Sequence, residues 1–392
     1  MIVPWNNAAG QRLWGTMKLF QCHRCRQPLY FENARCPSCD RTLGYIVATA
    51  TLSPLEPAAD WAWRALARPN TLYRLCANAE HGVCNWLVDA GDAQAFCLAC
   101  RHNRTIPDLS TPGNLAHWRK IEIAKHRLFY TLLALGLPLE TRAEDPSGLI
   151  FDFPQNPAGS ARVLTGHADG LITINLAEAD DAERERERSA MGEPYRTLLG
   201  HFRHEIAHYY WDRIADAASI TDYRDLFGDE RQNYAAALER HYAQGAPADW
   251  AERHVTSYAS AHPWEDFAET FAHYLHMVDT LETAEGFGLR IGPTAAADGL
   301  AATVDFDPHT ADLDRLVKAW LPLTFALNAI NRSMGMPDVY PFVLAPTVMF
   351  KLAFIHGRIR ALSGRAVKGK PGQALRAAAA VLTTRIGAIE TR

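Results

Sequence analysis

The residues whose types and spacing could do chemistry are the two histidines and the glutamate of HEIAH, residues 204–208. Side chains four positions apart lie on the same face of a helix, so His204 and His208 could direct two imidazole nitrogens at one metal ion. Glu205, one position further round the helix, could hold a water over the open side of that ion. Two ligands, a general base and a free position for water are the arrangement of a zinc hydrolase.

The elements around this motif must position it. Tyr195–Ile214 contains no proline, has Gly200 as its only glycine and repeats apolar residues at helical spacing, which predicts a helix.

A catalytic zinc takes three protein ligands, so the third must come from elsewhere. The best candidate segment is HPWEDFAETFAHYLHM, residues 262–277, where Glu265 and Glu269 share one helix face. One carboxylate could bind zinc while the other holds a ligand histidine, and spacing alone does not rank them.

Three other acidic residues compete for the third position. Asp212 falls on the ligand face, four residues after His208, but three ligands from one straight helix would span about 12 Å, too far to converge on one ion. Asp229 and Glu230, in LFGDE, are weaker candidates. We interpret four further histidines as surface or core residues: His241, His254, His273 and His276.

All eight cysteines lie between residues 22 and 100. The first four form two CxxC pairs separated by ten residues, the spacing of a zinc ribbon: Cys22, Cys25, Cys36 and Cys39. A redox motif would need a single CxxC near a βαβ pattern, which this segment lacks. The other four contain one regular CxxC and one stretched pair, and they predict a second zinc site: Cys76, Cys84, Cys97 and Cys100. His81 could replace Cys76 or Cys84 in that site, and loose buried thiols are the alternative.

These motifs divide the chain into five parts. We predict a disordered extension or misassigned start over residues 1–16, a zinc ribbon over 17–45, a second zinc module over 46–112, a catalytic domain over 113–363 and a basic, Ala-rich tail over 364–392 that frays. In the catalytic domain, further helices are expected at 114–137, 231–244, 264–284, 310–331 and 340–362, and strands at 149–153, 161–165 and 171–176 with a turn at 167–170. The charge-dense segment 178–193 is interpreted as a solvated helix or loop with ion pairs.

Composition and charge indicate which partners and which cellular compartment to expect. The net charge of −4 gives no electrostatic case for nucleic acid binding. No N-terminal charged-then-apolar segment indicates a signal peptide, so we expect a cytoplasmic protein whose cysteines bind metal rather than form disulfides. The most apolar stretch, residues 339–355, is interrupted by Pro341, Pro346 and Lys351, which predicts a buried helix rather than a membrane span.

A HExxH helix followed by a helix with Glu-x-x-x-Glu resembles the gluzincin metallopeptidases, in which the first of these glutamates binds zinc and the later acid supports a ligand histidine. EDFAETF, residues 265–271, is similar to the corresponding helix of the anthrax lethal-factor type of zinc endopeptidase. The resemblance implies that Glu265 binds zinc and that Glu269 supports a ligand histidine. In that type a tyrosine seven residues before the ligand glutamate helps to stabilise the oxyanion, a role that would fall to Tyr258.

The combined layout, a zinc ribbon followed by HFRHEIAHYYWD, FGDE and HPWEDFAETFAHYL, resembles the bacterial "putative zinc-binding metallopeptidase" family over about residues 17–360. No third histidine with the needed glycine follows His208, so the metzincin extension is absent. The resemblance implies an α+β, zincin-like catalytic domain, mostly helical with a small sheet, behind two small β-rich zinc modules. Together with the two groups of four cysteines, it predicts one catalytic and two structural zinc ions.

We therefore predict a zinc-dependent hydrolase, and more specifically a metallopeptidase in which Glu205 takes a proton from zinc-activated water. The strand expected at 171–176 could lie at a sheet edge and pair with an extended peptide substrate. The alternative is a non-enzymatic adaptor, although a structural zinc would not need a base at Glu205. The zinc modules could bind a partner protein, bind nucleic acid or cap the catalytic domain, and their unexceptional charge favours nucleic acid least.

Overall fold

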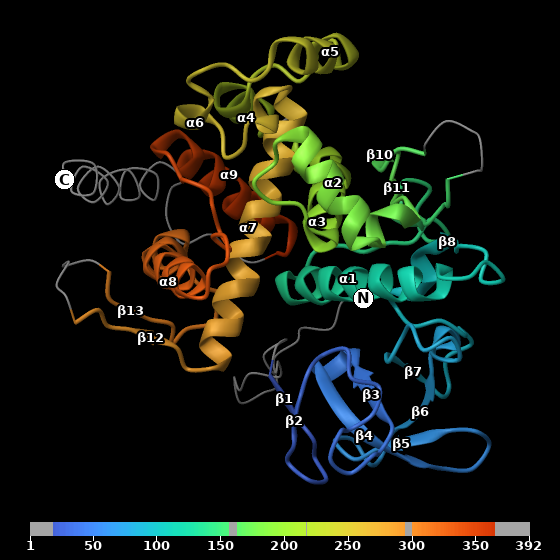
Figure 1. Cartoon of the computed structure of the whole chain (residues 1–392). Helices are drawn as coiled ribbons and strands as arrows, with labels where there is room; N and C mark the ends of the chain where they lie inside the picture. Colours follow the sequence, from blue (N-terminus) through green and yellow to red (C-terminus); the bar gives the residue numbers. More distant parts are fainter. Residues whose placement is uncertain (1–18, 157–162, 217, 295–299, 365–392) are drawn as a thin grey trace.

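The structure is a computed structural model in which residues 19–156, 163–216, 218–294 and 300–364 are described. Within that part a β-rich N-terminal region precedes a helical C-terminal region, and helix α1 (Asn114–Leu135) lies between the two (Figure 1). Helix and sheet are mixed, as expected. The extension expected at 1–16 and the tail beyond residue 364 lie outside the described residues.

The N-terminal region is built from short strands and the cysteine-bearing turns between them. The strands are β1 (Phe20–Gln21), β2 (Pro28–Leu29), β3 (Leu43–Ile46), β4 (Thr51–Pro57), β5 (Trp63–Ala65), β6 (Leu72–Leu75) and β7 (Leu87–Asp89). β1 and β2 form one antiparallel pair, and β3 to β7 form an antiparallel sheet in chain order. The boundary expected between residues 45 and 46 falls inside β3, so the sheet of β3 to β7 continues across it.

Aromatic side chains join this region to α1. The ring of Phe31 lies 5.0 Å from that of Tyr45 and 6.1 Å from that of Trp86, measured between centroids. The ring of Tyr130, on α1, lies 5.6 Å from Phe31. All four side chains are buried in one hydrophobic core that continues into the C-terminal helices. Burial of such large rings stabilises the contact by several kcal/mol, at roughly 25 cal/mol per Å² of apolar surface.

The C-terminal region is mostly helical. After α1 come α2 (Asp181–Met191), α3 (Leu198–Ile214), α4 (Ile220–Phe227), α5 (Tyr234–Gln244), α6 (Trp250–Arg253), α7 (Pro263–Gly286), α8 (Leu313–Ser333) and α9 (Pro346–Leu362). Single 3-10 turns lie at η1 (Val47–Thr49), η2 (Ala77–Ala79), η3 (Cys100–His102), η4 (Leu176–Ala179) and η5 (Tyr258–Ser260). No helix of the described residues is long and apolar enough to cross a membrane.

The expected helices are present with shifted ends, whereas α4 and α6 were not predicted. The first helix ends at Leu135 because Gly136, with φ of 72°, adopts the left-handed conformation that terminates helices. The last helix begins at Pro346 and not at residue 340, because proline is suited to the first turn of a helix. The residues just before Pro346 are not helical.

A small sheet lies beside α3 and corrects two predictions. Its strand order is β10 (Gly166–Ala168), β11 (Leu171–Thr173), β9 (Ile150–Asp152), β8 (Asn103–Thr105). The strand expected at 161–165 is wrong, because residues 163–165 are not extended in a ladder and residues 161 and 162 lie outside the described part. The hairpin turns instead at Asp169 and Gly170, whose φ values of 48° and 77° suit a two-residue turn.

The same strand order shows that the edge prediction was wrong. β11 pairs with β10 on one side and β9 on the other, so its backbone is already bonded. Among the described strands, the unpaired edge nearest α3 belongs to β10. A separate short pair, β12 (Arg290–Ile291) with β13 (Ala302–Thr303), lies before α8.

Helices α3 and α7 pack together at the centre of the C-terminal region, with α1 against α3 and α9 against α7 (Figure 1). The start of α3 is held by Thr197, whose hydroxyl accepts a hydrogen bond from the Gly200 N–H. The start of α7 is held by His262, whose Nδ1 accepts from the Trp264 N–H, with Pro263 at the first helical position. These two helix starts set the register in which the helices face each other.

Candidate active site

Two histidines of α3 and a glutamate of α7 converge where these helices pack together. His204 Nε2 lies 3.2 Å from His208 Nε2 and 3.0 Å from Glu265 Oε2, and His208 Nε2 lies 3.7 Å from Glu265 Oε1. Ligand atoms of the three residues all lie within 4.8 Å of one another, and Glu265 is buried. Two imidazole nitrogens facing a carboxylate oxygen are a donor set that suits a catalytic zinc, with one position left for water.

Glu269, one turn after Glu265, contacts the other nitrogen of His204. Its Oε1 lies 2.7 Å from His204 Nδ1, and its Oε2 accepts a hydrogen bond from Thr256 Oγ1 at 2.8 Å. A carboxylate at Nδ1 keeps the proton there, so Nε2 is free to bind a metal. The two glutamates that share a helix face therefore differ in position. Glu265 faces both imidazoles, and Glu269 holds one of them from behind.

The surroundings determine the charges of these groups. Burial lowers the pKa of His208 to about 3, so that imidazole is neutral near neutral pH. Burial by itself would raise the pKa of Glu265, but the hydrogen bond with His204 lowers it to about 2. Burial by itself would lower the pKa of His204, whereas hydrogen bonds to Glu265 and Glu269 raise it well above the usual value. The carboxylates thus favour a positive charge at this point, which a proton or a divalent metal ion can supply.

Glu205 lines a cavity of about 240 Å³ beside these three residues. Burial raises the pKa of Glu205 to about 7, so near neutral pH the carboxylate can both take up and release a proton. Tyr258, in η5, lines the same cavity, and its ring centroid lies 6.1 Å from that of His204. Burial raises the pKa of the Tyr258 phenol, which keeps its proton and can donate a hydrogen bond.

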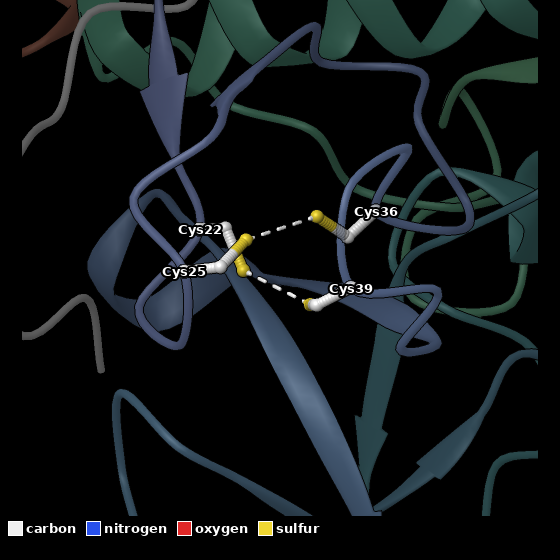
Figure 2. Close-up of side chains that lie close together, drawn as sticks. All are labelled: Cys22, Cys25, Cys36 and Cys39. Carbon is white, nitrogen blue, oxygen red and sulfur yellow. Dashed lines mark hydrogen bonds between the residues drawn. The ribbon is translucent and has the colours of Figure 1, made fainter.

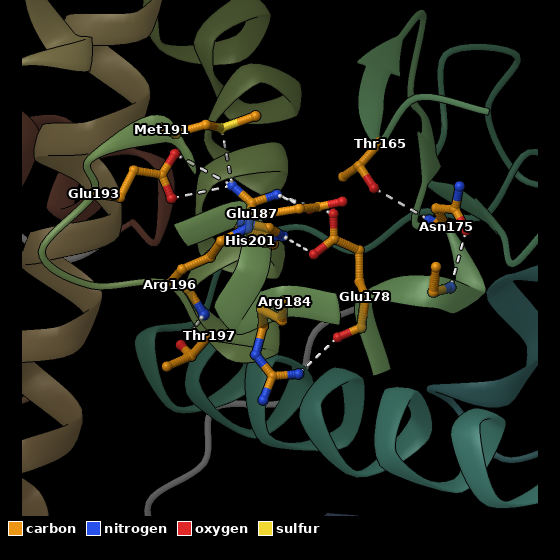
Figure 3. Close-up of polar contacts among 12 residues, drawn as sticks. Thr165, Asn175, Glu178, Arg184, Glu187, Met191, Glu193, Arg196, Thr197 and His201 are labelled. Carbon is orange, nitrogen blue, oxygen red and sulfur yellow. Dashed lines mark hydrogen bonds and ion pairs between the residues drawn. The ribbon is translucent and has the colours of Figure 1, made fainter. Parts of the chain in front are cut away.

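An ion-pair cluster lies at the start of α3 (Figure 3), and three of its members line the cavity: Glu193, Arg196 and His201. Arg196 Nη2 lies 3.1 Å from Glu178 Oε1 and 2.9 Å from Glu187 Oε2, and Nη1 lies 3.1 Å from Glu193 Oε2. His201 Nδ1 lies 3.2 Å from Glu178 Oε2. The charge-dense segment was expected to be solvated, but Glu178 and Glu187 are buried. The expectation is wrong for the inner face of this segment, where α2 and η4 are held to the start of α3.

The competing acidic residues lie elsewhere. Asp212 is exposed, Asp229 forms an ion pair with Arg231 at 2.8 Å, and Glu230 forms one with Arg224 at 2.5 Å. The four other histidines contact separate groups: His241 the ring of Tyr258, His254 the carboxylate of Asp266, His273 the hydroxyl of Tyr340, and His276 the ring of Trp320.

Tyr234, the first residue of α5, was not predicted. Its hydroxyl donates a hydrogen bond to Glu265 Oε1 at 2.7 Å. The two residues are 31 positions apart and belong to different helices, so no local spacing rule connects them. The contact becomes visible only in the fold.

The first four cysteines form a compact cluster at the turns next to β1 and β3 (Figure 2). Cys22 Sγ lies 3.8 Å from Cys39 Sγ, and Cys25 Sγ lies 3.5 Å from Cys36 Sγ. All four sulfurs lie within 4.8 Å of one another, and all four are free thiols. Such a set of sulfurs suits one tetrahedral zinc.

The other four cysteines form a second, fully buried cluster. Their sulfurs also lie within 4.8 Å of one another, and Cys84 Sγ is 3.7 Å from Cys97 Sγ. His81, the alternative ligand, instead lies 3.2 Å from the carboxylate of Glu80 and is not part of this group. The residues of the cluster are Cys76, Cys84, Cys97 and Cys100.

His126, on α1, joins the second cluster and was not predicted. Its Nε2 lies 3.3 Å from Cys84 Sγ, 4.0 Å from Cys97 Sγ and 3.8 Å from Cys100 Sγ. Its Nδ1 donates to the backbone oxygen of Glu122 at 2.6 Å, so Nε2 is the nitrogen that faces the sulfurs. The helix that packs against α3 therefore also contacts the second cysteine cluster.

Residues 114–358 match the family described as "putative zinc-binding metallo-peptidase", and residues 19–111 match a zinc-ribbon domain. The chain belongs to this metallo-peptidase family. Three of its relatives are the uncharacterized proteins Mb2598c of Mycobacterium bovis and MT2644 and Rv2568c of Mycobacterium tuberculosis. Each is 41% identical over 343 residues, which cover 87% of this chain and 94% of the relative. No solved structure matches the chain.

The metallo-peptidase family assignment agrees with the donor sets that the chain presents. The part that matches the peptidase family contains the His204, His208 and Glu265 group, and the part that matches the zinc ribbon contains both cysteine clusters. His126 comes from the peptidase part and reaches the second cluster. Nitrogen, oxygen and thiolate donors in groups of three or four are the ligands that zinc takes in proteins.

Proposed function

We propose that this member of the metallo-peptidase family is a zinc-dependent peptidase with a zincin-like catalytic domain. One observation carries the proposal: His204, His208 and Glu265 converge from two helices directly beside Glu205, which lines a cavity. A purely structural zinc site would be closed by a fourth ligand and would need no carboxylate at an open side. The two cysteine clusters would hold structural zinc ions in this proposal.

The residues would divide the chemistry as follows. Zinc, when bound, would act as a Lewis acid that lowers the pKa of water from about 15.7 toward about 7. His204, His208 and Glu265 would hold the ion, and Glu269 would fix the tautomer of His204. Glu205 would take the proton from the attacking water and then pass it to the leaving amine of the cleaved peptide bond.

Tyr258 would stabilise the developing oxyanion. Its phenol lines the cavity that Glu205 also lines, and it keeps its proton because burial raises its pKa. A protonated phenol can donate a hydrogen bond to the carbonyl oxygen as negative charge grows there. Removing one such donor costs about 3 kcal/mol of transition-state stabilisation in other acyl-transfer enzymes.

A peptide substrate could align along β10, whose outer edge is free within the described residues. β10 packs next to α3, so a strand added there would run past the histidines. An extended peptide pairing with a sheet edge presents its backbone carbonyls in a regular register. We therefore propose peptides or unfolded protein segments as substrates, and a zinc ribbon that caps the catalytic domain through α1.

The experiment compares the wild type with Glu205→Gln, which keeps the volume of the side chain but cannot accept the proton. Both proteins are incubated with a diverse peptide library and with a cell lysate, and new termini are counted by mass spectrometry. We expect the variant to retain zinc and to lose about 10²- to 10⁴-fold in rate. Equal behaviour of the two proteins in both assays would favour a non-enzymatic adaptor.

A further inference from the structure

The two carboxylate oxygens of Glu265 have different partners. Oε2 lies 3.0 Å from His204 Nε2, at the point where the imidazoles meet. Oε1 accepts a hydrogen bond from the hydroxyl of Tyr234 at 2.7 Å and lies 3.7 Å from His208 Nε2. One oxygen is therefore closest to the ligand nitrogens, and the other is already engaged by a phenol.

The position of Tyr234 follows from the start of α5. Asn233 caps this helix by accepting a hydrogen bond from the Ala236 N–H, which fixes the first turn. The ring of Tyr234 packs edge-on against His262, with centroids 5.2 Å apart, and lies 6.1 Å from the ring of Trp264. These two aromatic residues begin α7, so the same contacts that hold the start of α7 aim the phenol at Glu265.

We infer that Tyr234 is a positioning residue that makes Glu265 bind metal through one oxygen. A carboxylate can offer a metal either one oxygen or both. The phenol of Tyr234 has one proton, and donating it to Oε1 lowers the tendency of that oxygen to become a second ligand. With two imidazoles and one oxygen the ion keeps a fourth position for water, whereas a two-oxygen carboxylate would compete for it. This inference rests on the proposed zinc site.

Tyr234 and Tyr258 then have separate tasks. Tyr258 lines the cavity beside Glu205, where substrate would lie. Tyr234 is not among the residues that line that cavity, and its hydroxyl is directed at a ligand oxygen. Tyr234 should therefore affect how the metal is held, and Tyr258 should affect turnover.

The experiment uses the full-length protein with Co²⁺ in place of zinc at the open site, and Glu265→Ala as the spectral blank. Cobalt reports its coordination number by the intensity of its visible absorption, which is stronger for four ligands than for five. The variants are Tyr234→Phe, Tyr258→Phe and a matched control, Tyr223→Phe. The Tyr223 hydroxyl donates to the Pro263 backbone oxygen at 2.9 Å, so the control removes a phenol from the start of α7 without touching Glu265.

We expect Tyr234→Phe to weaken the visible absorption and to lower Co²⁺ affinity about 10- to 100-fold in a competition with a chelator. Tyr258→Phe should keep both properties and lose turnover, and Tyr223→Phe should keep both properties. In Tyr234→Phe the ring keeps its packing against His262 and Trp264, and only the hydroxyl is lost. Tyr234→Leu, which loses both, should give the same spectral change if loss of the hydroxyl is the cause.

Two results would overturn the inference while leaving the peptidase proposal intact: a wild-type spectrum and affinity in Tyr234→Phe, or the same spectral change in Tyr258→Phe. The absence of any cobalt spectrum that depends on Glu265 in the wild type would overturn the zinc site itself and, with it, this role of Tyr234. The two kinds of failure are thus distinguishable from the wild-type spectrum alone.

Discussion

Replacement of Glu269 tests the division of roles between the two glutamates of α7. Its carboxylate lies 2.7 Å from His204 Nδ1 and accepts from Thr256 Oγ1 at 2.8 Å. Glu269→Ala leaves the Nδ1–H without its acceptor. A hydrogen bond to a charged group contributes about 1.5–3 kcal/mol, which is about 10- to 100-fold in affinity at about 1.4 kcal/mol per tenfold. We therefore expect zinc at the open site to bind about 10- to 100-fold more weakly.

Glu269→Gln separates geometry from charge. The amide oxygen can still accept from His204 Nδ1, so only the negative charge is removed, and we expect a loss of less than about tenfold. Glu265→Ala removes a ligand and should lower affinity more than either change at Glu269. Asp212→Asn is the control, because Asp212 is exposed and lies outside the group that could hold the ion.

The assay is a titration of each purified protein with a chromophoric chelator, in which the readily removed zinc is counted separately from the thiolate-held zinc. Circular dichroism on each variant checks that the fold is retained. The reasoning would be refuted if Glu269→Ala bound zinc as tightly as the wild type and the Asp212→Asn control. It would also be refuted if Glu269→Ala weakened binding more than Glu265→Ala, because Glu269 would then be the ligand.

Two further predictions concern metal content and pH. Elemental analysis should find three zinc ions per chain. A chelator should remove the ion at His204 and His208 before the two ions held by sulfur, because closed thiolate sites lack an open position. A single zinc ion in intact, unstripped protein would contradict the assignment of two cysteine clusters. Burial lowers the pKa of His356 from 6.5 to about 4. Between pH 6.5 and about pH 4 the imidazole is therefore protonated in the unfolded chain but not in the folded chain. The free energy of unfolding then falls as the pH drops through this window. From about pH 7 to about pH 5, protonation linked to His356 should lower the free energy of unfolding by about 2 kcal/mol. In urea unfolding, His356→Gln should therefore lose less stability over this pH range than the wild type. Equal losses in the two proteins would argue against this role of His356.

The sequence alone determined those parts of the site that depend on local spacing. His204, Glu205 and His208 follow from a helix, because four residues make about one turn and bring the two imidazoles to one face. The two CxxC pairs of the first cluster follow from the tight turns that such spacing forms. The long helices were also predictable, because their apolar periodicity extends over many residues, although their ends moved where Gly136 and Pro346 stop or start a helix.

The tertiary structure decided which of two equivalent side chains faces which neighbour. Glu265 and Glu269 share a helix face, and only the register of α7 against α3 brings the first to both imidazoles and the second behind one of them. The same holds for the sheet edge: among the described strands β10 and not β11 lies at the edge, because pairing order is a long-range property. Spacing rules express contacts within one turn or one hairpin, so they carry no information on such choices.

The contacts of Tyr234 and His126 show the same limit most clearly. Tyr234 reaches Glu265 from another helix. His126 lies in the part that matches the peptidase family and reaches sulfurs in the part that matches the zinc ribbon. In both cases a side chain of ordinary type gains its role from the packing of distant segments. The free energy of that packing comes from burial over the whole core, to which every part of the chain contributes, and no short pattern of residues encodes it.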